Sequence, residues 1–163
     1  MWERIRRFSA LERPARGLFL RAAALLPLVS LSLRLRGYRK TQSFLQKFLS
    51  ATGHVANGFA ADSIDLTVRL VRTAARHGAG HPTCLEESLV LWWLLARQGV
   101  SSELRIGVRK CGEKFEAHAW VECEGVAVNE PDGLHEHYAA FVDTEKSLEK
   151  ITPRRRARHH RDE

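Results

Sequence analysis

The chain contains 163 residues, of which 44% are hydrophobic, and it carries a formal net charge of +7. This length can fill one hydrophobic core with an appended helical segment, but it excludes two full domains. The excess positive charge is concentrated near the two ends, without the interleaved aromatic side chains of a base-stacking surface, so we expect no nucleic-acid partner.

Cysteine usage favours a reducing compartment. The chain has three cysteines, an odd number with irregular spacing that does not suit a disulfide framework. Its first twenty residues contain recurring arginines and lack the compact apolar core and cleavage site of a secretory signal. Cys111 and Cys123 lie on either side of His118 in the sequence, but they form no CxxC pair. We therefore expect a cytoplasmic protein without a metal or another cofactor.

Residues 1–60 are predicted to form an N-terminal helical region. The apolar run from Leu18 to Leu35 is interrupted by Arg21, Pro27 and Arg34. Because this run is too short and too broken to span a bilayer, we expect a kinked helix pair packed in the core or against a partner. A helix on a membrane surface is the alternative, but membrane contact is not our expectation.

The next part of the chain is predicted to begin with two helices. The first starts at a polar cap, residue 62 or 63, and stops at Gly78. The second begins after Thr83 and ends at Gly99. Thr83 and Glu86 have the spacing of a capping box, which makes Cys84 the first residue of this helix.

Cys84 at a helix start can be a nucleophile. The positive end of the helix dipole favours a thiolate there, and the unpaired backbone amides can hold a developing oxyanion. The alternative is a small buried hydrophobe, as most free cysteines are. A nucleophilic Cys84 requires a nearby base.

Two strands are predicted to follow, from Leu104 to Val108 and from Phe115 to Cys123, because apolar and polar residues alternate in both. His118 lies on the second strand, on the face opposite its alanine neighbours. The small alanines leave room for a helix end to approach the imidazole.

A turn after the second strand brings Asn129 and Glu130 level with His118 in an antiparallel hairpin. A two-residue loop would place Asn129 on the face of His118. A three-residue loop from Cys123 to Gly125, with a bulge, would place Glu130 opposite His118. Either side chain could orient the imidazole.

A helix-start cysteine, a strand histidine and an acid or amide on the next strand follow the order of a cysteine-nucleophile triad. The stretch HPTCLEESLVLWWLLARQGVSSELRIGVRK, followed by FEAHAWVECEGVAVNEP, resembles the leader peptidases of lasso-peptide maturation, a branch of the transglutaminase-like cysteine proteases. The resemblance covers Gly80 to Pro131 closely, and LERPARGLFLRAAALL is similar to the family's stand-alone form. The family usually has aspartate at the position of Glu130. We therefore favour Glu130 as the orienter and, with it, the bulged turn.

The resemblance implies an α+β fold of the papain-like or transglutaminase-like kind, with N-terminal helices and a small antiparallel sheet. The protease core would occupy residues 61–150, followed by a basic, disordered tail at 151–163. The implied activity is hydrolysis by a leader peptidase, with Cys84 as nucleophile, His118 as base and Glu130 as orienter; Asn129 is the alternative orienter. The implied partners are the precursor peptide, cut at its leader–core junction, a separate leader-binding protein and an ATP-dependent cyclase.

Two other functions stay open. A transglutaminase or deamidase would use the same residues to pass the acyl group to an amine or to act on glutamine. A non-catalytic basic adaptor would not need Cys84 at all.

Overall fold

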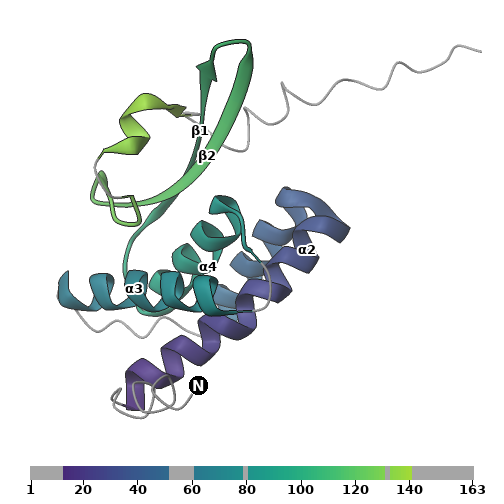
Figure 1. Cartoon of the computed structure of the whole chain (residues 1–163). Helices are drawn as coiled ribbons and strands as arrows, with labels where there is room; N and C mark the ends of the chain where they lie inside the picture. The colour runs from purple at the N-terminus through teal and green to yellow at the C-terminus, as the bar shows by residue number, and fades with distance from the viewer. Residues whose placement is uncertain (1–12, 52–60, 79–80, 131–132, 141–163) are drawn as a thin grey trace, which may run out of the picture.

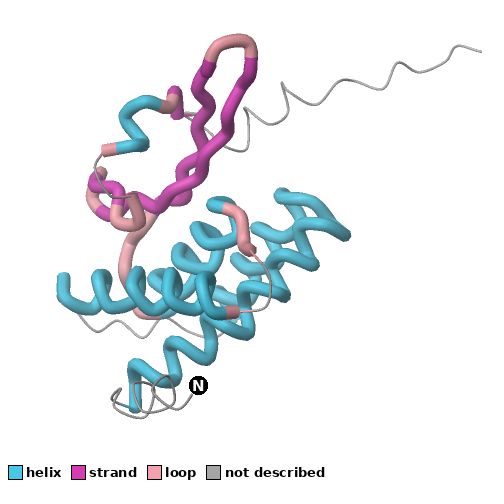
Figure 2. Tube along the Cα trace, in the orientation of Figure 1, coloured by secondary structure: helices cyan, strands magenta, loops and turns pink. Residues whose placement is uncertain are grey.

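The computed structural model describes residues 13–51, 61–78, 81–130 and 133–140, which form a layer of helices beside a curled antiparallel sheet (Figures 1 and 2). The expected α+β fold, with helices before a small antiparallel sheet, is confirmed. The predicted boundary at residue 60 and the basic tail at 151–163 lie outside the described residues.

The first described helix, α2 (Arg13–Ala51), consists of two arms. The backbone leaves the helical conformation at Gly37, with φ 75° and ψ 174°. Figure 1 shows α2 folding back on itself. The Oγ of Ser32 and the Oγ1 of Thr41, 2.8 Å apart, join the two arms by a hydrogen bond. The kinked helix pair expected within Leu18–Leu35 is therefore wrong: the helix continues through Pro27 over this run, and the two arms separate only at Gly37.

The length of α2 bears on the expected absence of membrane contact. By length and composition alone, the described part of the chain has one helix, Arg13–Leu49, that could cross a membrane. Core helices of soluble proteins can have the same length and composition. The expectation that the apolar run does not span a bilayer therefore stays a prediction.

Helices α3 (Ala61–His77) and α4 (Cys84–Arg97) pack against α2 and confirm the two helices predicted for this region. α3 turns its apolar face inward, whereas α4 is apolar over most of its surface and lies at the centre of the core. Ala22, Leu26 and Val29 of α2 share this core with α4. The N-terminal helix pair and the following elements thus bury their apolar surface in one cluster.

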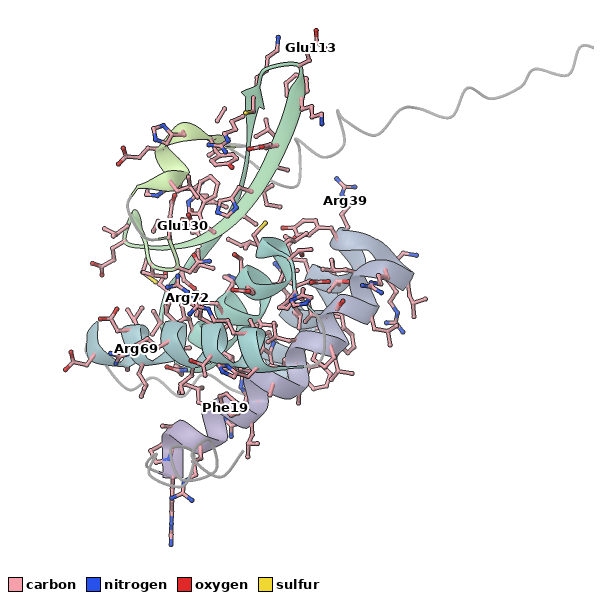
Figure 3. All side chains as sticks on the ribbon, viewed as in Figure 1. Phe19, Arg39, Arg69, Arg72, Glu113 and Glu130 are labelled. Atoms are coloured by element: carbon pink, nitrogen blue, oxygen red, sulfur yellow. The ribbon has the colours of Figure 1, made fainter. Side chains whose placement is uncertain are left out.

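The sheet has the strand order β3-β2-β1-β4. Its centre is the hairpin of β1 (Glu103–Cys111) and β2 (Lys114–Cys123); its edges are β3 (Val126–Ala127) and β4 (Ala139–Ala140). A short 3-10 helix, η1 (Leu134–His137), precedes β4. Val121 and Cys123 of β2 belong to the core shared with the helices. The far end of the hairpin, where Figure 3 labels Glu113, projects away from the helices.

The turn between β2 and β3 differs from the favoured prediction. Cys123 pairs with Val126, so the loop contains only Glu124 and Gly125, and the predicted three-residue bulged turn is wrong. Both loop residues have positive φ, 51° and 79°, as in the two-residue turns whose twist matches that of antiparallel strands. Strand β3 ends at Ala127, one further backbone hydrogen bond runs from the N–H of Val128 to the oxygen of Val121 at 2.9 Å, and the regular ladder then ends.

Candidate active site

Cys84 is the first residue of α4, as predicted. The backbone N–H of Thr83 donates to Oε2 of Glu86 at 2.6 Å, and the N–H of Glu86 donates to Oγ1 of Thr83 at 3.4 Å, which completes the capping box. Cys84 is exposed. Within the described segments, the backbone N–H groups of Cys84 and Leu85 donate to no other group, so both are available to an incoming anionic group.

His118 is paired with Glu130. The Nε2 of His118 lies 2.5 Å from Oε1 of Glu130, and the two side chains are 16% and 6% exposed. Because a carboxylate can only accept a hydrogen bond, Nε2 carries the proton and donates it. Nδ1 is then the nitrogen left to accept a proton from a nucleophile. The partial exclusion of water from this pair strengthens its electrostatic attraction.

A hydrogen bond between helix and strand brings the start of α4 to the strand of His118. Cys84 and Ser88 lie on the same face of α4, one turn apart. The Oγ of Ser88 donates to the backbone oxygen of Ala119 at 2.9 Å, and Ala119 directly follows His118. In Figure 2 the end of α4 that follows the loop 81–83 is the end turned toward the sheet. No hydrogen bond joins Cys84 to His118 among the residues described, but such contacts often tighten only when substrate binds.

Asn129, the alternative orienter, makes other contacts. Its Oδ1 accepts from the backbone N–H of Val121 at 2.7 Å, and its Nδ2 donates to Oγ of Ser88 at 3.1 Å. Its own backbone oxygen accepts from Nη2 of Arg72 on α3 at 3.0 Å, and Figure 3 shows Arg72 below the segment that carries Glu130. Asn129 thus ties β2, α4 and α3 together where regular strand pairing has ended.

Two aromatic rings flank the imidazole of His118. The centroid of the Trp120 ring is 6.2 Å away with nearly parallel planes, and that of Tyr138 is 5.2 Å away. Gly107 on the neighbouring strand makes room for this arrangement. A Cβ at Gly107 would lie 2.9 Å from both Cβ of Tyr138 and Cη2 of Trp120, closer than real side chains approach.

Two of these residues, Ser88 and Tyr138, were not predicted from the sequence. The signal for Ser88 was available: it is a polar residue in an apolar helix, four positions after Cys84. Tyr138 had no such signal, because its place beside His118 depends on the pairing of Val108 with Ala139.

The other cysteines have different surroundings. Cys123 is 8% exposed and belongs to the core, where burial, and secondarily the charge of Glu124, raises the pKa of its thiol. Cys111 is exposed at the projecting end of the hairpin. No cluster of three or more His, Cys, Asp or Glu side chains in the described ranges could hold a metal ion.

The carboxyl group of Glu87 on α4 has a shifted pKa. Partial burial raises the pKa of Glu87, while the charges of Arg72 and Arg76 act in the opposite direction. Glu87 directly follows the capping residue Glu86 and faces α3 through these arginines.

Comparison with known proteins identifies a family. No curated protein and no solved structure matches the chain. The family model described as the transglutaminase-like superfamily matches residues 25–143, which is more than half of the chain and includes Cys84, His118, Asn129 and Glu130. The helices, the four-stranded antiparallel sheet and the matched range agree, and the chain therefore belongs to the transglutaminase-like superfamily, whose members are usually cysteine-based enzymes.

Proposed function

We propose that the chain is a cysteine peptidase that removes the leader from a lasso-peptide precursor, with Cys84, His118 and Glu130 as its catalytic residues. The observation that supports this chemistry is the position of the exposed Cys84 at the capped start of α4. A hydrogen bond from Ser88 of the same helix joins α4 to the strand that carries His118, which is paired with Glu130. The substrate class rests on the resemblance of residues 80–131 to leader peptidases.

The proposed reaction has two steps. Nδ1 of His118 takes the proton of the Cys84 thiol while the sulfur attacks the carbonyl carbon of the scissile peptide bond. The N–H groups of Cys84 and Leu85 hold the oxyanion, and His118 returns the proton to the leaving amine. The product is a thioester on Cys84. His118 then activates water, which hydrolyses the thioester and frees the sulfur.

Glu130 acts on the imidazole from the opposite side. Its carboxylate holds Nε2–H, which fixes the tautomer and stabilises the imidazolium formed in both steps. Glu130→Gln keeps the size of the side chain but removes the charge, and we expect it to lower kcat by about 10²- to 10⁴-fold. We expect Asn129→Ala to lower kcat much less in the protein that remains folded, because Asn129 does not contact the imidazole.

The test is cleavage of a synthetic precursor peptide spanning a leader–core junction, followed by mass spectrometry. Hydrolysis gives two fragments whose masses sum to that of the precursor plus one water. Cys84→Ala and His118→Ala should abolish these fragments while the proteins remain folded. Cys111→Ala is the matched control, since it removes another exposed cysteine, and it should cleave like the wild type.

Other results would assign other functions. A one-mass-unit increase at glutamine, or an adduct with an added amine, without chain cleavage would identify deamidase or transglutaminase chemistry. Full activity of a folded Cys84→Ala protein in a cell-based maturation assay would identify a non-catalytic adaptor.

The proposed reaction needs partners. A leader-binding protein would present the precursor, since the N-terminal part of this chain that is described is helical and has no strand to which a leader could add. An ATP-dependent cyclase would use the freed amino terminus for ring closure. We expect cleavage by the chain alone to be slow and to accelerate when the leader-binding protein is added; equal rates would contradict this dependence.

A further inference from the structure

The first arm of α2 has two apolar faces. One face carries Ala22, Leu26 and Val29, which are buried in the core with α4. On the opposite side, four leucines remain largely exposed at 56%, 60%, 53% and 74%, namely Leu20, Leu28, Leu31 and Leu35. Their spacing of eight, three and four residues places them in one stripe along the helix. We call these four residues the leucine stripe.

Positive charge borders the leucine stripe. At 3.6 residues per turn, Arg21 and Arg34 lie on opposite sides of it, and both are exposed. The whole of α2 contains basic residues and no acidic residue. The basic residues are Arg13, Arg16, Arg21, Arg34, Arg36, Arg39, Lys40 and Lys47.

The second arm repeats this combination. Phe44 and Phe48 are 46% and 51% exposed, and their ring centroids are 5.3 Å apart. The guanidinium carbon of Arg36 lies 6.0 Å from the centroid of the Phe44 ring. A surface groove beside Phe44 is lined by basic side chains, including Lys40 and Lys47.

We propose that α2 binds the surface of an anionic lipid bilayer through the leucine stripe. Leucine and phenylalanine side chains at the boundary between headgroups and acyl chains, with arginine and lysine among the phosphates, are the pattern of helices that lie in a membrane interface. The charge of α2 is of one sign along its entire length, which complements a uniformly anionic surface. The helix lies on the bilayer and does not cross it, because its opposite face is occupied by the protein core.

This inference is independent of the chemistry at Cys84, so its test does not require catalytic activity. The full chain is mixed with vesicles of phosphatidylcholine alone, or of equal parts phosphatidylcholine and phosphatidylglycerol, and floated on a density gradient. We expect flotation only with the anionic vesicles, and weaker flotation as salt is raised. Leu28→Ser combined with Leu31→Ser should lower the partition coefficient by about tenfold or more, and Arg21→Glu combined with Arg34→Glu should do the same.

Two matched control variants change the same kinds of side chain outside α2. Phe115→Ser removes a hydrophobic side chain that is 75% exposed on the hairpin, and Arg69→Glu reverses an exposed charge on α3. Both should float like the wild type. Thermal unfolding of every variant shows whether the fold is retained, which is expected because the substituted side chains are exposed.

Several outcomes would overturn the proposal. They are the absence of flotation with anionic vesicles at low salt, equal flotation with neutral vesicles, and unchanged flotation of the stripe variants. Sedimentation velocity gives a further outcome that would overturn it. If the wild type does not bind vesicles but forms a dimer, and the combined Leu28→Ser and Leu31→Ser variant is a monomer, the leucine stripe is a contact between two copies of the chain. Capture of a leader-binding protein through the stripe, without vesicle binding, would equally assign it to a protein partner.

Discussion

We expect Ser88 and Asn129 to stabilise the fold as a coupled pair. Asn129→Ala removes the acceptor of the N–H of Val121, a residue with no exposed surface, and also the hydrogen bond to Ser88. An unpaired buried donor costs about 1–3 kcal/mol and a lost hydrogen bond about 1 kcal/mol, so the free energy of unfolding should fall by roughly 2–4 kcal/mol. Ser88→Ala leaves the oxygen of Ala119 and Nδ2 of Asn129 without this partner and should cost about 1–3 kcal/mol.

The double variant is the decisive measurement. The bond between Ser88 and Asn129 is lost in each single variant, so adding the two effects counts it twice. In urea unfolding, the double variant should therefore be less destabilised than the sum of the single variants, by about 1 kcal/mol. Additive effects, within about 0.5 kcal/mol, would show that the two side chains are energetically independent and would refute the network described here.

Other predictions concern the thiols and the packing of the aromatic rings. Iodoacetamide should label Cys84 faster than either of the other cysteines near neutral pH, and a digest analysed by mass spectrometry would show a different order if Cys84 is not the reactive thiol. Burial raises the pKa of Cys123, so its thiolate forms at higher pH than that of an exposed thiol, and its labelling should rise only in the alkaline range. Gly107→Ala should displace the ring of Tyr138 from His118 and cost about 1–3 kcal/mol, measured by thermal unfolding; an unchanged melting temperature would show that the site tolerates the added methyl group.

The predictions that the structure confirms rest on local patterns. The capping box of Thr83 and Glu86 depends on residues three apart, so the sequence alone could place Cys84 at the start of α4. The alternation of β2 likewise placed His118 on the face opposite its alanine neighbours, and Ala119 is buried while His118 pairs with Glu130.

The contact between His118 and Glu130 does not follow from regular strand pairing. The two-residue turn that is present would, by continued strand pairing, have placed Asn129 on the face of His118. The N–H of Val128 still donates to the oxygen of Val121 at 2.9 Å, but the N–H of Val121 donates to the side chain of Asn129 and the regular ladder ends there. The position of Glu130 next to His118 therefore depends on the irregular backbone that follows the paired residues. Counting residues along a regular hairpin could not predict this contact.

The turn within α2 was mislocated for a related reason. Pro27 lacks a backbone N–H, and proline ordinarily interrupts a helix, so a break was expected within Leu18–Leu35. The neighbouring Leu26 and Val29 are buried, and the packing of these side chains favours a continuous helix despite the lost hydrogen bond. Gly37 could adopt the positive φ that the reversal requires.

The short edges of the sheet bear on the solubility of the protein. An open sheet can recruit a strand from another molecule and so begin to aggregate, but β3 and β4 each present only two residues as an edge. Where β1 and β2 extend past these edges, the hairpin carries charged side chains, among them Lys110 and Lys114. Charged side chains along these open stretches disfavour pairing with a strand of another molecule, which opposes growth of a shared sheet during expression at high concentration.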